Sequence, residues 1–264
     1  MKMQSSFKKN DDALYDLKGF AKENPEMRAL VRNFGATPVL ILFDPALKKQ
    51  FAFQHDLYEV GDFFGEFFNI FTTGLVAVNG DEWKKQRKII SQSFHFEFIK
   101  DNLPVILNST REHLKELSQK ELNDINVLSE MEMITGDVVG RIFFSESFKE
   151  YQIKGKPVGT YLIDNLENVG KSFMSVGYLL FGPKYIEKGL WKSHRDVMED
   201  VQLLKDTCRK ILDDRKKAQL QNKDLAWYLL ESQKNPKEED RLSDQAIISN
   251  YVTFIMVNFS DDFL

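Results

Sequence analysis

The sequence has one cysteine, few turn-forming residues and no long apolar run. One cysteine among 264 residues excludes an internal disulfide framework and a multi-cysteine zinc or iron–sulfur site. Seven prolines and 14 glycines are too few to favour disorder or an all-β fold with many tight turns. No run approaches about 18 apolar residues, so no transmembrane helix is predicted. The polar stretch 1–12 lacks the apolar segment of a signal peptide. We therefore expect a soluble or at most peripheral chain.

The chain also lacks an excess of positive charge. Its 36 basic and 40 acidic residues give a net charge of −4, so nucleic acid is not expected as a partner. The hydrophobic fraction of 42% is ordinary for a globular protein, and the length predicts one or two domains. Phenylalanine stands out with 22 residues.

Several kinds of catalytic motif are missing. The four histidines, His55, His95, His113 and His194, have no metal-ligand spacing, and we expect each to lie at the surface or to be satisfied in the core. The sequence has no Gly-x-Gly-x-x-Gly, no phosphate-binding Gly-x-x-x-x-Gly-Lys-Ser/Thr loop and no Gly-x-Ser-x-Gly nucleophile elbow. Cys208 lies on an apolar helical stripe, which predicts a buried core thiol.

Near the N-terminus the pattern predicts one strand and an aromatic segment. The apolar run Val39–Phe43 ends at Asp44-Pro45, which indicates a buried strand followed by a helix. Further on, a phenylalanine stripe has helical spacing, and it predicts either core packing or an aromatic loop that covers a ligand. Its members are Phe63, Phe64, Phe67, Phe68 and Phe71.

From Gly80 onward the chain is predicted to be mostly helical. Asp81 is a plausible N-cap for a helix over Glu82–Phe94. Two more helices are predicted by apolar residues three and four apart: Val127, Met131, Ile134, Val138 and Ile142 in the first, and Val197, Val201, Leu204, Cys208 and Ile211 in the second. Ser243-Asp244 would cap a last helix that runs to Leu264. Because a buried helix face needs partners, we expect the chain to be truncated within this helix.

One helix face combines apolar residues with a cation. Trp83, Arg87, Ile90 and Phe94 follow steps of 4, 3 and 4, which places them on one face. A guanidinium cannot lose its charge, so Arg87 must either reach water or meet an anion. The anion could be an Asp or Glu of the chain, in a structural ion pair beside a core Trp83. It could also be the carboxylate of an otherwise apolar ligand, bound by Arg87 together with the indole N–H of Trp83.

The stretch around this face resembles the C-helix of the cytochrome P450 family. It reads Gly80-Asp81-Glu82-Trp83-Lys84-Lys85-Gln86-Arg87-Lys88 and continues to Phe94, and the family pattern is Gly-x-x-Trp-x-x-x-Arg with a Phe shortly after. Other stretches resemble the family in the same order: Leu40–Pro45 the early strand and its Asp-Pro turn, Ile134–Phe144 the E-helix, Asn222–Leu230 the segment before the I-helix, and Leu242–Ile255 the start of the I-helix. Ser145 stands where the family has Gly after the E-helix.

The resemblance implies a fold and a set of site residues. The fold would be mainly α, with a few short N-terminal β-strands, and residues 1–264 would form a partial domain from the A-helix region to the I-helix. Trp83 and Arg87 would bind the propionates of haem, and Lys84, Lys85 and Lys88 would lie towards the surface where an electron-donor protein docks, unless they are simply a solvated helix face. Val76, Ala77 and Met256 would line the substrate pocket.

The sequence departs from the family at two places. The family's Phe-x-x-Gly loop with the Cys ligand of the haem iron, preceded by a Glu-x-x-Arg, is not found as a unit, and the helical context of Cys208 differs from that loop. Thiolate donation favours O–O cleavage, so this chain alone is not expected to insert oxygen. At the I-helix, Asp261 or Asp262 could take the acidic catalytic position in an ambiguous register, but no Thr follows.

The resemblance implies a haem-dependent monooxygenase that hydroxylates an apolar small molecule with O2. Its electrons would come from an NADPH-dependent reductase or another donor protein, and no metal ion besides the haem iron is expected. The family suggests the endoplasmic-reticulum membrane, although no anchor is recognised in this chain. The alternative is a non-catalytic helical binding or scaffold protein of the same descent.

Overall fold

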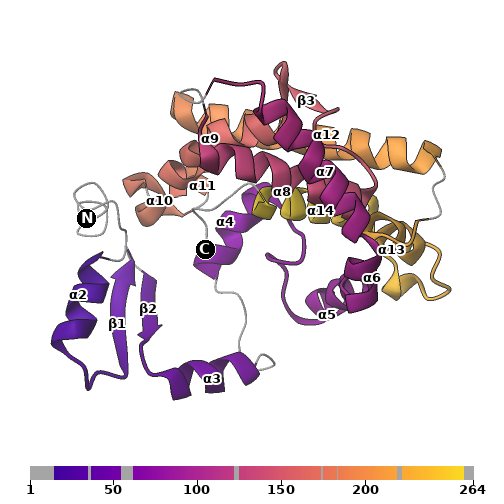
Figure 1. Cartoon of the computed structure of the whole chain (residues 1–264). Coiled ribbons are helices and arrows are strands. Elements are labelled where there is room, and N and C mark those ends of the chain that lie inside the picture. The colour runs from indigo at the N-terminus through magenta and orange to yellow at the C-terminus, as the bar shows by residue number, and fades with distance from the viewer. Residues whose placement is uncertain are drawn as a thin grey trace.

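The computed structural model describes residues 15–34, 37–54, 62–121, 125–173, 175–182, 184–218 and 222–258. Two parts can be followed in Figure 1: a small N-terminal group of elements and a larger helical body beside it. The N-terminal group contains helix α2 (Tyr15–Glu23), strands β1 (Ala29–Phe34) and β2 (Thr37–Leu42), and helix α3 (Pro45–Phe53). The mainly helical fold with small strand pairs, predicted from the sequence, is confirmed.

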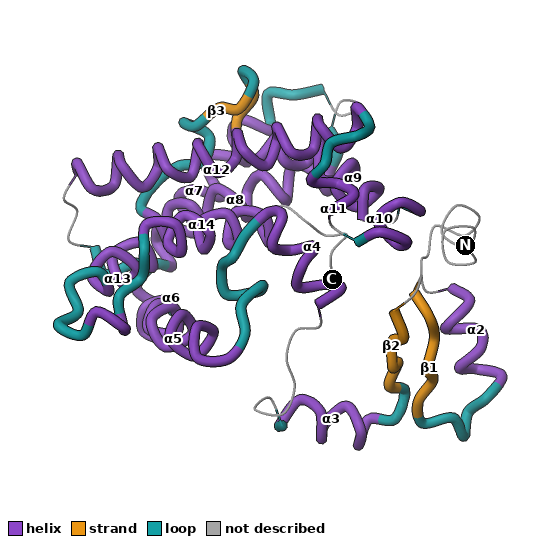
Figure 2. Tube along the Cα trace, turned by 180° about the vertical axis from the view of Figure 1, so that it is seen from behind, coloured by secondary structure: helices purple, strands orange, loops and turns teal. Residues whose placement is uncertain are grey.

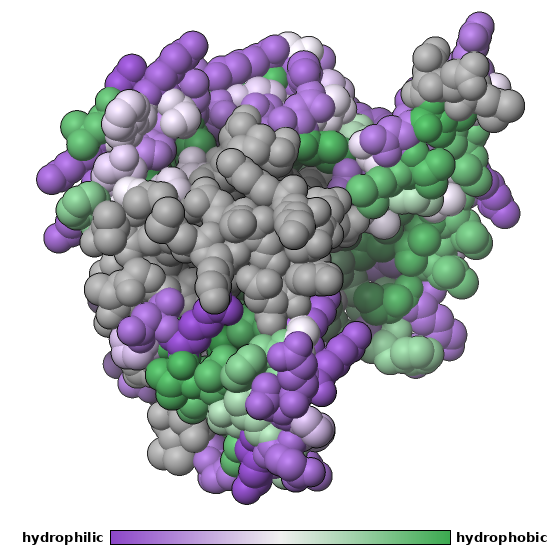
Figure 3. Space-filling model, turned by 90° about the vertical axis from the view of Figure 1, so that its left-hand side faces the viewer, coloured by the Kyte–Doolittle hydropathy of each residue, from purple (hydrophilic) through white to green (hydrophobic). Residues whose placement is uncertain are grey.

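The predicted early strand exists, but it is not buried. It forms β2, which pairs antiparallel with β1, and Leu30 lies opposite Ile41. Leu40 is 60% exposed, so the prediction of a buried strand was wrong. The apolar run gave no sign of the partner strand, which contains Arg32 and Asn33. Figure 3 shows hydrophobic patches among hydrophilic residues on this side of the molecule.

A helix follows the early strand as predicted, and Asp44 is its N-cap. Its carboxylate accepts hydrogen bonds from the N–H groups of Ala46 (2.6 Å) and Leu47 (3.4 Å), and Pro45 occupies the first turn of α3. The hydrogen bond from the Arg28 guanidinium, together with these backbone bonds, holds the pKa of the Asp44 carboxyl below the usual value.

The helical body is built mostly of antiparallel and crossing helices, and α14 (Asp244–Asn258) lies among them (Figures 1 and 2). Its elements up to the small hairpin are α4 (Asp62–Phe71), α5 (Gly80–Ile90), the 3₁₀ turn η1 (Ser91–Ser93), α6 (Phe96–Asp101), α7 (Leu103–Leu117), α8 (Val127–Phe144), β3 (Gln152–Ile153) and β4 (Lys156–Pro157). They are followed by α9 (Val158–Phe173), α10 (Val176–Phe181), α11 (Lys184–Glu187), α12 (Lys192–Ala218), α13 (Leu225–Ser232), the 3₁₀ turn η3 (Glu238–Asp240) and α14 (Asp244–Asn258).

The core forms where α14 packs against α8 and α12. The buried face of α12 has the predicted spacing and consists of Val197, Val201, Leu204, Cys208 and Ile211. The buried face of α14 consists of Ile247, Ile248, Tyr251, Val252 and Ile255. On α8, Ile134 and Ile142 are buried and Val138 is partly buried. Val127 is 66% and Met131 41% exposed, so the prediction of a core-facing stripe was wrong for the first turn of this helix.

Two other local predictions have clear outcomes. The segment α4 is helical, and Phe71 at its end is buried while Phe68 is partly buried; the side chains of Phe63, Phe64 and Phe67 lie outside the described residues. The helix predicted over Glu82–Phe94 begins earlier and ends earlier, because α5 covers Gly80–Ile90 with Asn79 at its N-cap. Asp81 therefore lies in the first turn and is not the cap.

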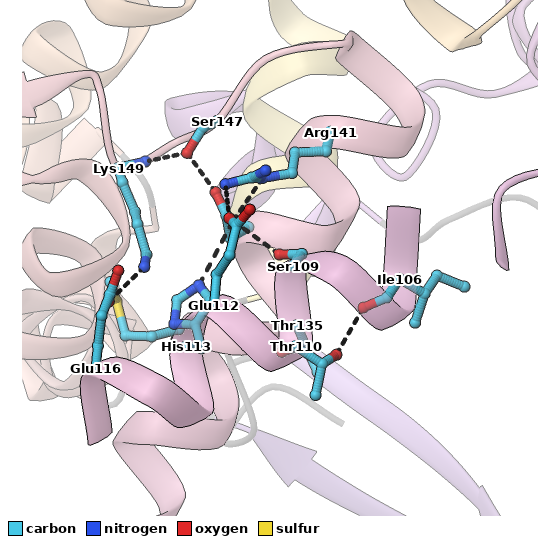
Figure 4. Close-up of polar contacts among 12 residues, drawn as sticks. Ile106, Ser109, Thr110, Glu112, His113, Glu116, Thr135, Arg141, Ser147 and Lys149 are labelled. Carbon is cyan, nitrogen blue, oxygen red and sulfur yellow. Dashed lines mark hydrogen bonds and ion pairs between the residues drawn. The ribbon is translucent and has the colours of Figure 1, made fainter. Parts of the chain in front are cut away.

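A buried carboxylate fixes α7 to α8 (Figure 4). Asp137 on α8 accepts hydrogen bonds from Ser109 Oγ on α7 (2.9 Å), Ser147 Oγ (2.5 Å) and Arg141 Nε (2.8 Å). His113 Nε2 lies 3.5 Å from the same carboxylate. Burial alone would raise the pKa of Asp137, but these hydrogen bonds and the charge of Arg141 hold it well below the usual value.

Candidate functional site

An apolar pocket opens between α5, α14 and the loop before α5. Its volume is about 360 Å³, which is within the range of small-molecule sites. The lining residues are Leu75 and Val76 from the loop, Arg87, Ile90, Ser91 and Phe94 from α5 and the following turn, and Thr253, Phe254 and Val257 from α14. Most of these side chains are apolar, and one carries a positive charge.

Aromatic packing supports the wall formed by Phe94. The Phe94 ring lies 4.9 Å from the Phe143 ring and 6.0 Å from the Phe254 ring, measured between centroids. Phe143 is buried on α8, whereas Phe94 is 47% exposed. The contacts connect the pocket to the core, so one side of Phe94 is anchored and the other faces the pocket.

Arg87 is the cation of this pocket. It lies three residues before Ile90, which is 1% exposed, while Arg87 itself is exposed. Among the described residues, its guanidinium has no ion-pair or hydrogen-bond partner. The structural Arg–Asp/Glu pair considered above is therefore not found in this part of the chain. Arg87 instead reaches solvent at the rim of the pocket, beside apolar walls, and this leaves its guanidinium accessible to an external anion.

Trp83 lies one turn before Arg87 on α5 and is partly buried. It is not among the residues that line the pocket. Of the four residues predicted to share a helix face, Arg87, Ile90 and Phe94 line the pocket. Phe94 lies after the end of α5, beyond the 3₁₀ turn η1. Whether Trp83 assists Arg87 in binding an anion stays a prediction.

The predicted substrate residues lie at different depths. Val76 is 38% exposed and lines the pocket. Ala77 is buried beside it, and Met256 packs partly buried against the core; neither belongs to the lining. Asp261 and Asp262 lie outside the described residues.

Sequence reasoning missed the contribution of α14 to this wall. Thr253, Phe254 and Val257 line the pocket, and their spacing of one and three residues places them on one helix side. That spacing is visible in the sequence. The opposite side of α14 is apolar as well, so the pattern could not indicate which residues face a cavity.

The single cysteine belongs to the core and not to the pocket. Cys208 on α12 is fully buried, as predicted, and burial raises the pKa of its thiol. Within the described ranges, no group of three or more His, Cys, Asp or Glu side chains is arranged to hold a metal ion. No described helix has the length and hydropathy needed to cross a membrane.

The donor set of the pocket fits haem. A porphyrin is flat and largely apolar and has carboxylate tails, so it needs apolar walls and a cation at the edge. Arg87 supplies a guanidinium without a partner in the described chain, and Val76, Ile90 and Phe254 supply apolar surface. Charge-assisted bonds from Arg to carboxylate are among the strong hydrogen bonds in proteins.

Comparisons with known proteins agree with this reading. "Cytochrome P450 72A68" from Medicago truncatula is 28% identical over 208 residues, which cover 75% of this chain and 38% of that protein. "Cytochrome P450 72A11" from Arabidopsis thaliana is 27% identical over 236 residues, covering 85% and 44%. "7-deoxyloganic acid hydroxylase" from Catharanthus roseus is 32% identical over 128 residues, covering 44% and 23%. The chain thus spans less than half the length of these relatives.

The family model named Cytochrome P450 matches residues 30–257. This match covers most of the chain, from β1 through nearly all of α14, and includes every residue of the pocket. The chain belongs to the cytochrome P450 family.

Proposed function

We propose that this chain provides the propionate-binding side of the haem site in a haem-dependent monooxygenase. The observation that carries the proposal is Arg87, a guanidinium without a partner among the described residues at the edge of an otherwise apolar pocket. Family membership supports the choice of haem as the anionic ligand. When bound, haem would supply the iron chemistry that activates O2.

The residues of this chain would bind and orient the cofactor. Arg87 would pair with a propionate, and the Trp83 N–H would add a second donor one turn away. Ile90 and Phe94 would contact the apolar macrocycle and exclude water, which strengthens the ion pair at Arg87. In this proposal Val76, Ala77 and Met256 contribute to the wall facing an apolar small-molecule substrate.

The same proposal assigns the remaining predicted roles. Asp261 or Asp262 would be the acidic residue of the I-helix. An electron-donor protein, such as an NADPH-dependent reductase, would dock near Lys84 and Lys88, which are exposed on α5. Lys84 also lies 4.0 Å from Asp81, and Lys85 pairs with Glu82 at 2.7 Å. The site of action would be the endoplasmic-reticulum membrane.

The isolated chain would bind haem without inserting oxygen. Its one thiol, Cys208, is fully buried on α12 and is not part of the pocket, so the axial thiolate would have to come from outside this chain. We expect no thiolate-type carbon monoxide difference band when haem and reductant are added. Such a band, if abolished by Cys208→Ala in a chain that still folds, would contradict this part of the proposal.

Haem titration of the 264-residue chain tests whether Arg87 binds a haem propionate. The Soret absorbance is followed for the wild type, Arg87→Ala and Lys88→Ala. Arg87→Ala should weaken haem binding by about tenfold or more, because a charge-assisted bond is lost. Lys88→Ala removes the same charge from the neighbouring exposed position and should change the affinity less than twofold.

Two results would contradict the proposal. One is the absence of any Soret change in the wild-type chain. The other is equal haem affinity for the wild type and Arg87→Ala, which would favour the non-catalytic helical protein of the same descent.

A further inference from the structure

One buried amide connects three segments around the pocket. Asn250 on α14 is fully buried. Its Nδ2 donates to Gln86 Oε1 on α5 at 2.8 Å and to the carbonyl of Ala246 at 2.9 Å, and its Oδ1 accepts from the backbone N–H of Leu75 at 3.0 Å. A single side chain therefore bonds α5, the loop before α5 and its own helix.

The bonds to Gln86 and to Leu75 each connect Asn250 to a segment that lines the pocket. Gln86 precedes Arg87 and is 1% exposed, and its Nε2 also donates to Glu82 Oε1 at 2.9 Å. Consecutive residues of a helix point about 100° apart, so fixing the Gln86 side chain on α14 fixes the rotation of α5. That rotation determines where Arg87 points.

The bond to Leu75 acts in the same way on the loop. Leu75 and the adjacent Val76 both line the pocket. The loop approaches α14 closely, since a Cβ on Gly74 would lie 2.5 Å from Thr253 Oγ1. The hydrogen bond from the Leu75 N–H to Asn250 therefore fixes the position of this loop along α14.

Hydroxyl groups attach the same loop to α14 one turn away. Thr72 Oγ1 donates to the carbonyl of Ser249 at 2.5 Å and lies 3.0 Å from Thr253 Oγ1. The N–H of Gly74 donates to Thr72 Oγ1 at 2.9 Å. The loop thus has a second attachment, whereas Gln86 meets α14 through Asn250. Loss of the amide should affect α5 more than the loop.

We propose that Asn250 is a positioning residue of the pocket. It holds α5 and the loop against α14 so that Arg87 and Val76 border the same cavity. The role in haem binding rests on the proposed function, but the positioning itself does not, because it is a property of the chain without cofactor.

Amide hydrogen exchange in the haem-free chain tests the positioning directly. Asn250→Leu replaces the amide with an apolar side chain of similar size and leaves both partners unsatisfied. Exchange should become about tenfold faster or more in α5 and measurably faster at Leu75–Ala77, while α7 remains unchanged. Ser109→Ala, which removes a buried hydrogen bond between α7 and α8, is the matched control and should show the reverse pattern.

A second variant separates the two bonds and covers the case in which Asn250→Leu does not fold. Gln86→Leu removes the bonds of Gln86 to Asn250 and to Glu82 but leaves the bond between Asn250 and Leu75, so it should accelerate exchange in α5 and leave the loop protected. Unchanged exchange in α5 for Gln86→Leu would overturn the proposal, as would equal acceleration throughout the chain.

Haem affinity tests whether Asn250 acts by positioning Arg87. If Asn250 aims Arg87, the tenfold loss expected for Arg87→Ala should shrink to less than about threefold in the Asn250→Leu background, because the cation is already misplaced. An equal loss in both backgrounds would overturn the proposal. If the wild-type chain binds no haem, the proposed function fails, and the exchange data still decide the positioning role.

Discussion

The Ser145 hydroxyl donates a hydrogen bond of 2.5 Å to Asp224 Oδ2. The backbone of Ser145 is in the left-handed region, with a φ of 54°. Ser145 follows the last residue of α8, at the position where the sequence comparison led us to expect Gly. A left-handed conformation costs a non-glycine residue about 1 kcal/mol. The hydrogen bond from Ser145 to the buried carboxylate therefore offsets the backbone strain of this residue.

These two opposing contributions predict different effects for two substitutions of Ser145. Ser145→Ala keeps the strain and loses the bond, so it should lower the free energy of unfolding by about 2 kcal/mol. Ser145→Gly loses the same bond but relieves the strain, and it should be about 1 kcal/mol more stable than the alanine variant. Urea unfolding measures both. Equal stability of the two variants would show that the φ angle carries no cost here.

Arg215 and Asp224 form a buried ion pair between α12 and α13. Both are 2% exposed, and Arg215 Nη2 lies 3.1 and 3.0 Å from the two carboxylate oxygens. Arg215→Met should destabilise the chain by about 3–5 kcal/mol, because it leaves a buried carboxylate without its counter-ion. Adding Asp224→Asn removes that charge and keeps an N-cap residue for α13. The double variant should therefore be more stable than Arg215→Met.

The control for this cycle is Lys216→Met on the same helix. Lys216 pairs with Asp244 at 3.1 Å, but both side chains are more than one third exposed, so the change should stay within about 1 kcal/mol. Thermal unfolding monitored by circular dichroism compares all variants. A double variant that is less stable than Arg215→Met would contradict the expected coupling.

Gly74 makes the close approach of the pocket loop to α14 possible. A Cβ at this position would lie 2.5 Å from Thr253 Oγ1 and 2.8 Å from the carbonyl oxygen of Ser249. Gly74→Ala should therefore push the loop away and destabilise the chain by about 1–3 kcal/mol. Gly19→Ala on α2 is the matched control, because nothing lies within 4 Å of its added Cβ. The control should be neutral or slightly stabilising, since Ala favours helix. Thermal unfolding compares the two, and an equal midpoint for both variants would contradict the prediction.

Periodic patterns predicted the helices of the body well. The stripe from Val197 to Ile211 on α12 is buried throughout, because a 27-residue helix packed on one side imposes its repeat on the sequence. The same reasoning placed Val127 in the core incorrectly. A spacing pattern identifies a common face but not where along the helix the neighbouring elements end.

The site was predictable only in part. Arg87 stood out because a permanent charge on an apolar face requires an explanation. Asn250 and Gln86 gave no comparable signal, since their hydrogen bond joins positions 164 residues apart and a polar residue in a helix is ordinarily solvated. The N-cap of α5 was also misplaced: Asp81 has the right chemistry, but the backbone becomes helical one residue before it.

The carboxylate of Asp137 makes the stability of the chain depend on pH. Although burial alone would raise its pKa, the nearby His113 imidazole, hydrogen bonds from Ser147 and Ser109 and the charge of Arg141 depress it in the folded state. The unfolded chain therefore takes up a proton on this group at a higher pH than the folded chain does. The stabilisation from Asp137 is fully present above the unfolded pKa of about 4 and is lost progressively as the pH falls below it.

Urea unfolding at pH 7, 5, 4 and 3 should reveal this dependence. The wild-type free energy of unfolding should decrease below about pH 4, by up to about 1.4 kcal/mol per pH unit from this group. Asp137→Asn should be less stable at pH 7, because it weakens the bonds between α7 and α8, and it should have a flatter profile below pH 4. Asp213→Asn, at an exposed position on α12, should keep the wild-type slope. If Asp137→Asn retained that slope, another carboxylate would have to be the source of the acid sensitivity.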